Sequence, residues 1–97
     1  MKLARVLGQV VLSQQIEPYR DKSLHLIRDV DRELQGVGDP EVAVSWQAMA
    51  EGDLVVVEVS REACNAFETP IAADAAIIGR ADRVHIDTAF RGQAGEI

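Results

Sequence analysis

Apolar and polar residues alternate along much of the chain with the period of two that β-strands show. In residues 2–13, one side of this alternation is entirely apolar, whereas the other side mixes apolar with polar residues. The apolar side predicts a strand face buried in a core, and Gly8 at its centre predicts a bend or a close approach of backbones. The residues of this predicted core face are Ala4, Val6, Gly8, Val10 and Leu12.

Four later segments have the length and the patterning of strands. They are Ser23–Val30, Glu41–Trp46, Leu54–Val59 and Asp74–Ile86. Clusters of Gly, Pro and Asp separate them, as at residues 36–40 and 52–53, and such clusters are typical of turns. Residues 60–66 lack a strand pattern and predict a short helix with Ser60 as its N-cap.

Five strands in a chain of 97 residues predict a single domain of the mainly β class. An open sheet of five strands would leave two long edges unpaired, and closure into a barrel removes them. We therefore expect residues 1–87 to form a small closed barrel with one short helix. Residues 88–97 contain two glycines and no periodicity, so they predict a mobile tail.

The charge balance argues against nucleic acid as a partner. Sixteen acidic and ten basic residues give a formal net charge of −6, and a surface of that sign repels phosphate backbones. No apolar run approaches the roughly 18 residues that span a bilayer, and no secretory signal is visible at the amino end. The single cysteine excludes an internal disulfide and a cysteine-based zinc cluster. These features predict a soluble cytoplasmic protein.

The residue types that carry chemistry do not form a catalytic pattern. His25 and His85 lie in predicted strands without a second ligand at metal-binding spacing, so ordinary half-exposed positions are favoured. Cys64 has no nucleophile motif around it and is interpreted as a small buried thiol. Trp46 follows a strand, and such an aromatic more often packs in a core or an interface than on a ligand. We expect no catalytic residue, no metal and no cofactor.

Several segments, taken in order, carry a more specific signal. The first strand contains Gly-Gln-Val-Val followed within two residues by Ser, and a charged turn at residues 21–23 leads into a leucine-rich strand. Residues 42–44 (Val-Ala-Val) are followed at residues 51–56 by Glu-Gly-Asp-Leu-Val-Val. Residues 70–84 run from Pro through Asp-Ala, an isoleucine pair and Gly to an acidic residue and Val. In this order, residues 1–87 resemble the EutN/CcmL family of pentameric vertex proteins of bacterial microcompartment shells.

The resemblance implies a structural function. Family members form an OB-like barrel, and five copies assemble into a cyclic homopentamer that caps a vertex of the polyhedral shell and supplies the curvature that closes it. The implied partners are further copies of the chain and the hexameric and trimeric shell proteins of a cytoplasmic microcompartment. It implies no enzymatic activity, no nucleic acid and no membrane.

Eight residues are candidates for contacts in such an assembly. A monomer would leave Leu3, Leu7 and Val11 of the mixed face in water, so we predict that they contact the next copy, together with Gly52 and Asp53. Glu51, Ser60 and Arg61 are candidates for lining the axial pore or its loops. The family's glycines are replaced at Ala48–Ala50 and around Ser60, which bears on loop conformation and pore lining.

Two other functions stay open at this point. An OB-type module could bind single-stranded nucleic acid or a small ligand, although the net charge and the four scattered aromatic residues argue against it. A small enzyme could use Cys64, or a histidine paired with a carboxylate.

Overall fold

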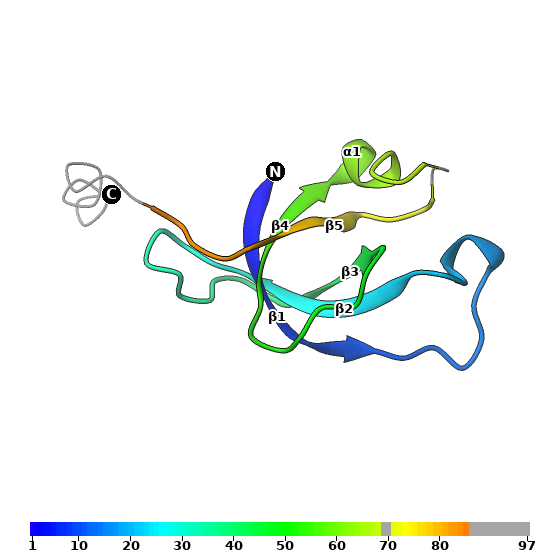
Figure 1. The fold of residues 1–97 in the computed structure, drawn as a ribbon, viewed down its shortest axis with the longest axis horizontal. Helices are drawn as coiled ribbons and strands as arrows, with labels where there is room; N and C mark the ends of the chain where they lie inside the picture. The colour runs from blue at the N-terminus through cyan, green and yellow to red at the C-terminus, as the bar shows by residue number, and fades with distance from the viewer. Residues whose placement is uncertain (69–70, 86–97) are drawn as a thin grey trace.

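The computed structural model describes residues 1–68 and 71–85. Within them, five strands and two short helices follow one another (Figure 1). The strands are β1 (Lys2–Val10), β2 (Ser23–Asp29), β3 (Glu41–Ser45), β4 (Leu54–Val59) and β5 (Ala75–Ala81), and the helices are the 3-10 helix η1 (Glu17–Tyr19) and α1 (Ser60–Cys64). The end of the predicted domain at residue 87 and the predicted tail at 88–97 lie outside the described residues.

The strands close into a barrel in the order β1-β2-β3-β5-β4. Every neighbouring pair is antiparallel except β3 and β5, which are parallel. Closure pairs every strand with two neighbours, although β3 and β5 pair over only two residues each. The predicted mainly β, OB-like five-stranded closed barrel with one short helix is therefore confirmed.

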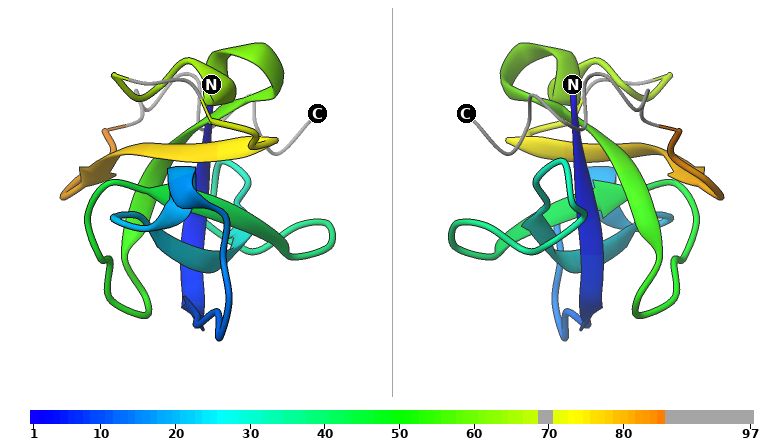
Figure 2. Two further views of the ribbon diagram at one scale, coloured as in Figure 1. Left: turned by 90° about the vertical axis from the view of Figure 1, so that its right-hand side faces the viewer. Right: turned by 90° about the vertical axis from the view of Figure 1, so that its left-hand side faces the viewer.

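The core has two parts. Small and β-branched side chains fill the barrel interior. Met49 and Val59, which are only partly buried, pack against them. A second cluster lies between the strands and the segment that contains α1, which covers the ends of β4 and β5 (Figure 2). The interior residues are Ala4, Val6, Ile27, Ala43, Val55, Val57, Ala75 and Ile77, and the buried residues of the second cluster are Val44, Ala63, Ile71 and Ala76.

A β-bulge at Leu7 interrupts the alternation of β1. Val6 pairs with Ile27 of β2, but Gly8 pairs with Leu26, so Leu7 is an extra residue. One extra residue reverses which side of the strand each later residue faces. The predicted core face is therefore right for Ala4 and Val6, which are buried, and wrong beyond them. Gly8 and Val10 are only partly buried and Leu12 is exposed.

Two strands end earlier than predicted. β1 ends at Val10 instead of Ser13, and β5 ends at Ala81, before the predicted end at Ile86, which lies outside the described residues. From residue 11 the chain leaves the barrel as an arm (residues 11–22) that carries η1 and returns into β2, at the right of Figure 1. Sequence alternation continues into this arm, although no neighbouring strand pairs with it.

The predicted helix is present, but its N-cap was predicted wrongly. Val59 occupies the N-cap position of α1 without a capping hydrogen bond from its side chain. Ser60 is the first residue of the helix and has a φ of 56°, in the left-handed region. The helix ends at Cys64, two residues before the predicted end.

Candidate subunit interface

The turn between β3 and β4 is attached to β1 at the bulge. The N–H of Gly52 donates to the carbonyl of Val6 (2.8 Å), and the N–H of Val6 donates to the carbonyl of Asp53 (2.9 Å). The guanidinium of Arg5 also donates to the carbonyl of Gly52 (3.0 Å). Leu7 follows directly in the chain and is exposed. The fold thus brings together three of the five predicted interface residues, namely Leu7, Gly52 and Asp53.

Asp53 closes this turn on itself. Its carboxylate accepts a hydrogen bond from the N–H of Ala50 (2.9 Å), and its own N–H donates to the Ala50 carbonyl (3.0 Å). Glu51 lies at the exposed tip between them. Among the turn residues only Gly52 has a positive φ, of 92°, so the alanines at positions 48 and 50 do not strain the turn.

The other two predicted interface residues lie elsewhere. Leu3 is half-buried and pairs with Val56 of β4, beside a groove that Val30, Leu34 and Val84 also line. Val11 lies on the arm and is 83% exposed. Eight residues of chain separate Leu3 from Val11, or about 25 Å in extended conformation. The predicted interface residues therefore lie in three separate places and do not form one continuous stripe.

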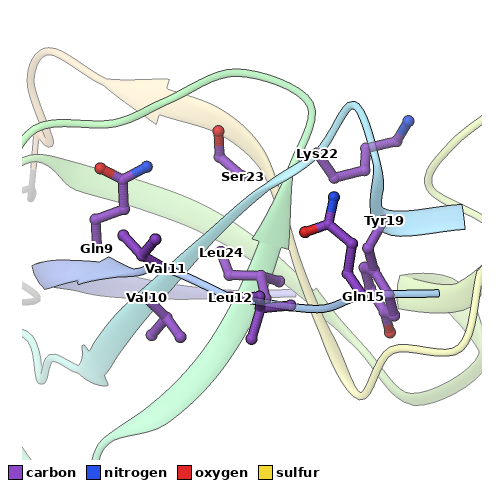
Figure 3. Close-up of a pocket in the computed structure, with 9 residues that line it drawn as sticks. All are labelled: Gln9, Val10, Val11, Leu12, Gln15, Tyr19, Lys22, Ser23 and Leu24. Atoms are coloured by element: carbon purple, nitrogen blue, oxygen red, sulfur yellow. The ribbon is translucent and has the colours of Figure 1, made fainter. Parts of the chain in front are cut away.

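The first half of the arm (residues 11–16) is an exposed segment without charge, and the sequence analysis singled out only Val11 of it as an interface candidate. Val11, Leu12 and Ile16 are all exposed, and residues 9–16 contain no charged side chain, although 27% of the chain is charged. A shallow pocket lies at the base of the arm, lined by the end of β1, the arm itself and the start of β2 (Figure 3). Exposed uncharged segments of this kind promote association with other chains. The absence of charge over residues 9–16 was the feature of the sequence that could have indicated this exposed segment.

Trp46 lies immediately after β3 and is 56% exposed, so it does not pack in the core. Together with Phe67 and Ile71 it lines a groove beside the arm residues Pro18 and Lys22. The ammonium of Lys22 lies 5.5 Å from the centre of the Phe67 ring, within cation–π distance.

Comparisons with known proteins identify the family and the fold of the chain. The family model described as ethanolamine utilisation protein EutN/carboxysome matches residues 1–82. The chain belongs to the EutN/CcmL family. Among curated protein sequences, none matches the chain.

Solved structures of this family have the same fold. The ethanolamine utilization protein EutN from Escherichia coli is 27% identical with a TM-score of 0.80, over 89% of each chain. The pentameric microcompartment shell protein GrpN from Rhodospirillum rubrum is 25% identical with a TM-score of 0.77, over 91% of this chain and 100% of GrpN. CcmL from Gloeobacter violaceus is 27% identical with a TM-score of 0.76, over 90% of this chain and 91% of CcmL. The resemblance inferred from the ordered segments is thereby confirmed, and this family consists of structural shell proteins.

In this EutN/CcmL barrel, the predicted pore residues lie at two ends of one strand. Glu51 precedes β4 and Ser60 and Arg61 follow it. Six strand residues span about 20 Å, and the β3–β4 turn and α1 lie on opposite sides of the barrel in both views of Figure 2. One opening at a five-fold axis would therefore be lined either by Glu51 or by Ser60 and Arg61.

The structure corrects the interpretation of His25. This side chain is fully buried (0% exposed), whereas a half-exposed position was predicted. It faces the barrel interior, as Ile27 does, and its Nε2 accepts a hydrogen bond from the N–H of Met49 (3.1 Å). Burial lowers the pKa of His25 below its ordinary value of 6.5, and the Gly8 backbone and Asp53 offset part of this effect.

The remaining reactive residues occupy ordinary positions in this EutN/CcmL chain. His85 is exposed and lies beyond the end of β5, not within a strand. Cys64 is half-buried, and its thiol donates to the carbonyl of Ala73 (3.2 Å). Within residues 1–68 and 71–85, no three His, Cys, Asp or Glu side chains are placed to hold a metal ion. No helix in these two ranges is long and apolar enough to cross a membrane.

Lys2 connects three strands at the amino-terminal end of β1. Its ammonium lies 3.1 Å from a carboxylate oxygen of Asp29 on β2 and 3.4 Å from one of Glu41 on β3. Burial alone would lower the pKa of Lys2, but the two carboxylates outweigh it and raise the pKa above 10.5. The group therefore stays charged at neutral pH and forms partly exposed ion pairs with β2 and β3, which contribute modestly to stability.

Proposed function

We propose that the chain is a structural shell protein of a bacterial microcompartment. In this proposal it forms a homopentamer that caps the vertices of the polyhedral shell and supplies the curvature that closes it. The observation that carries the proposal is the family match over residues 1–82. Relatives described as pentameric shell proteins, including GrpN, support it.

A five-fold ring requires a heterologous interface, in which one surface of a copy meets a different surface of the next. The chain offers two separate surfaces of this kind. One is the bulge surface, formed by Leu7, Gly52 and Asp53, where the β3–β4 turn is attached to β1. The other is the arm, with Val11 at its start, and Leu3 lies in a third contact area. Several hundred Å² of apolar surface buried at about 25 cal/mol per Å² would supply many kcal/mol before the cost of association.

The proposed partners outside the pentamer are the hexameric and trimeric proteins of the same shell, in the bacterial cytoplasm. In this proposal, hexameric shell proteins alone form a flat layer, and pentamers at the vertices allow that layer to close into a polyhedron. Either Glu51 or the pair Ser60 and Arg61 would line the opening on the five-fold axis. The proposed role requires no catalytic residue, cofactor, nucleic acid or membrane.

The mass of the purified protein in solution tests the proposal. Light scattering should give about 53 kDa, five times the chain mass of 10.6 kDa. A mass near that of one chain, or of a ring with another number of members, would contradict it.

Substitutions on the two proposed surfaces test where the subunits meet. Leu7→Asp and Val11→Asp should each lower the mass toward that of a monomer, while circular dichroism still shows the barrel, because a charge at either site opposes burial. Val37→Asp is the matched control, since Val37 is 41% exposed, much like Leu7 at 38%, and lies on neither surface. If both variants keep the full mass, the interface lies elsewhere.

A further inference from the structure

The loop between β3 and β4 (residues 46–53) is held to the barrel at two places. Gly52 and Asp53 hydrogen-bond to Val6 of β1, and one buried imidazole holds the middle of the loop. Nε2 of His25 accepts the N–H of Met49, from a residue 24 positions further along the chain. The Met49 side chain packs against the interior cluster, so this hydrogen bond fixes a residue that also contributes to the barrel core. No other side chain of β2 hydrogen-bonds this loop in the described part of the chain.

This hydrogen bond requires a particular protonation state. To accept an N–H, Nε2 must carry a lone pair, so the ring is neutral with its proton on Nδ1. Nδ1 is buried and forms no hydrogen bond of good geometry with described residues, although the Gly8 backbone is near enough to favour its proton. A second proton would go on Nε2, where it would face the Met49 N–H. The cation therefore cannot keep this contact.

The groups around His25 provide little compensation for a positive charge. Its cross-strand neighbours are Gln9 on β1 and Ala43 on β3, neither of which is charged. Asp53 favours the cation, but its carboxylate also accepts the Ala50 N–H within the same loop. Burial outweighs this attraction, and the pKa of His25 lies below 6.5 while the loop is closed.

We propose that His25 is a pH-sensitive latch on the β3–β4 loop: the neutral ring holds Met49 in place, and its protonation releases the loop. The released part of the loop adjoins Gly52 and Asp53, which stay hydrogen-bonded to Val6 of β1. Its movement should disturb the bulge surface next to it and weaken association between copies in mildly acidic solution, a consequence that rests on the proposed function.

Linkage gives the sign and the size of the effect. An open loop returns His25 toward its ordinary pKa of 6.5, whereas the closed loop holds it lower, so the open state binds more protons. Above about pH 6.5 the ratio of open to closed loop no longer depends on the protonation of His25. As the pH falls from there to the lowered pKa, the ratio of open to closed loop rises by up to about tenfold per pH unit.

The test follows three signals between about pH 7.5 and pH 5. The first signal is the fluorescence emission of Trp46, the single tryptophan, which lies at the start of the loop. The second is the rate of hydrogen exchange of the Met49 amide. The third is the mass measured by light scattering. In the unsubstituted protein, Met49 exchange, corrected for the pH dependence of the intrinsic exchange rate, should accelerate below about pH 6.5 by up to about tenfold per pH unit, and Trp46 emission should shift. His85→Gln, at the only other histidine, should behave identically. His25→Gln, which retains an acceptor but does not titrate, should remove the transition.

The outcomes separate the latch from the assembly. If His25→Gln and the unsubstituted protein show the same transition, the latch is refuted. If the mass is that of a monomer throughout but the loop signals change with His25, the latch holds and the proposed function fails. If His25→Gln does not fold, the titration of His25 is followed instead in the unsubstituted protein, through the NMR signals of its imidazole nitrogens. A Met49 amide resonance that stays constant while His25 titrates would overturn the proposal.

Discussion

Gly52 is a residue whose backbone conformation decides how the β3–β4 turn meets β1. Its φ of 92° is one that side chains with a Cβ rarely adopt, and an added Cβ would meet no other atom within 4 Å. The demand for glycine at this position is therefore conformational and not a matter of space. Because the Gly52 N–H reaches Val6, the same backbone conformation positions the bulge surface.

Replacing Gly52 with alanine should lower the free energy of unfolding by about 1–2 kcal/mol, since alanine must adopt a left-handed conformation. Urea denaturation followed by circular dichroism measures this change. Gly79→Ala is the matched control, because Gly79 also has open space around it but has no positive φ. Equal stability of the two variants would show that the turn relaxes without cost.

His25 shows the limit of sequence reasoning at the scale of one residue. A histidine in an alternating strand can face either side, and the sequence gives no indication of a partner for its ring. The partner is the main chain of Met49, which any residue type at that position could provide except proline. Burial of His25 therefore depends on a tertiary contact that leaves no pattern in the sequence.

At the scale of elements, β4 was predicted with the correct bounds, whereas β1 and β5 were predicted too long. β4 is a compact apolar run between a Gly-Asp turn and a polar segment, so local signals mark both of its ends. In β1 the alternation continues beyond Val10, where no strand pairs with the chain any longer. The bulge at Leu7 was not predicted, because it depends on the register between β1 and β2.

The contact of α1 with the barrel depends on a small side chain. Ala63 is fully buried in the cluster with Val44, Ile71 and Ala76. Ala63→Leu should overpack this cluster and cost about 1–3 kcal/mol of unfolding free energy, measured by urea denaturation. Ala66→Leu, at an exposed position just after the helix, should change stability by less than about 0.5 kcal/mol. A similar small effect of both would mean that α1 moves freely away from the strands.

At the scale of the whole molecule, the family was predicted from the order of short segments, because each segment reflects a turn or a buried strand of the barrel. The arrangement of the candidate interface was predicted only in part. Leu7, Gly52 and Asp53 meet because β1 and the β3–β4 turn are hydrogen-bonded, whereas Leu3 and Val11 lie far apart on the same strand and its extension. Adjacency on one face of a strand was assumed, and the bulge and the arm remove it.

An obligate ring should melt in a way that depends on protein concentration, since association stabilises only the folded chain. We expect the Tm of the unsubstituted protein to rise by several degrees over a hundredfold increase in concentration. The Tm of Val11→Asp should stay constant over the same range. Differential scanning calorimetry measures both, and a concentration-independent Tm for the unsubstituted protein would contradict assembly through the arm.

The single extra residue in β1 also has an evolutionary consequence. Ala4 and Val6 before the bulge stay in the core, whatever direction the chain takes after it. Loss of this one residue would exchange the faces to which the later side chains of β1 point. Homologues that differ by it would present different side chains at the end of β1 and the start of the arm, while the interior of the barrel stays the same.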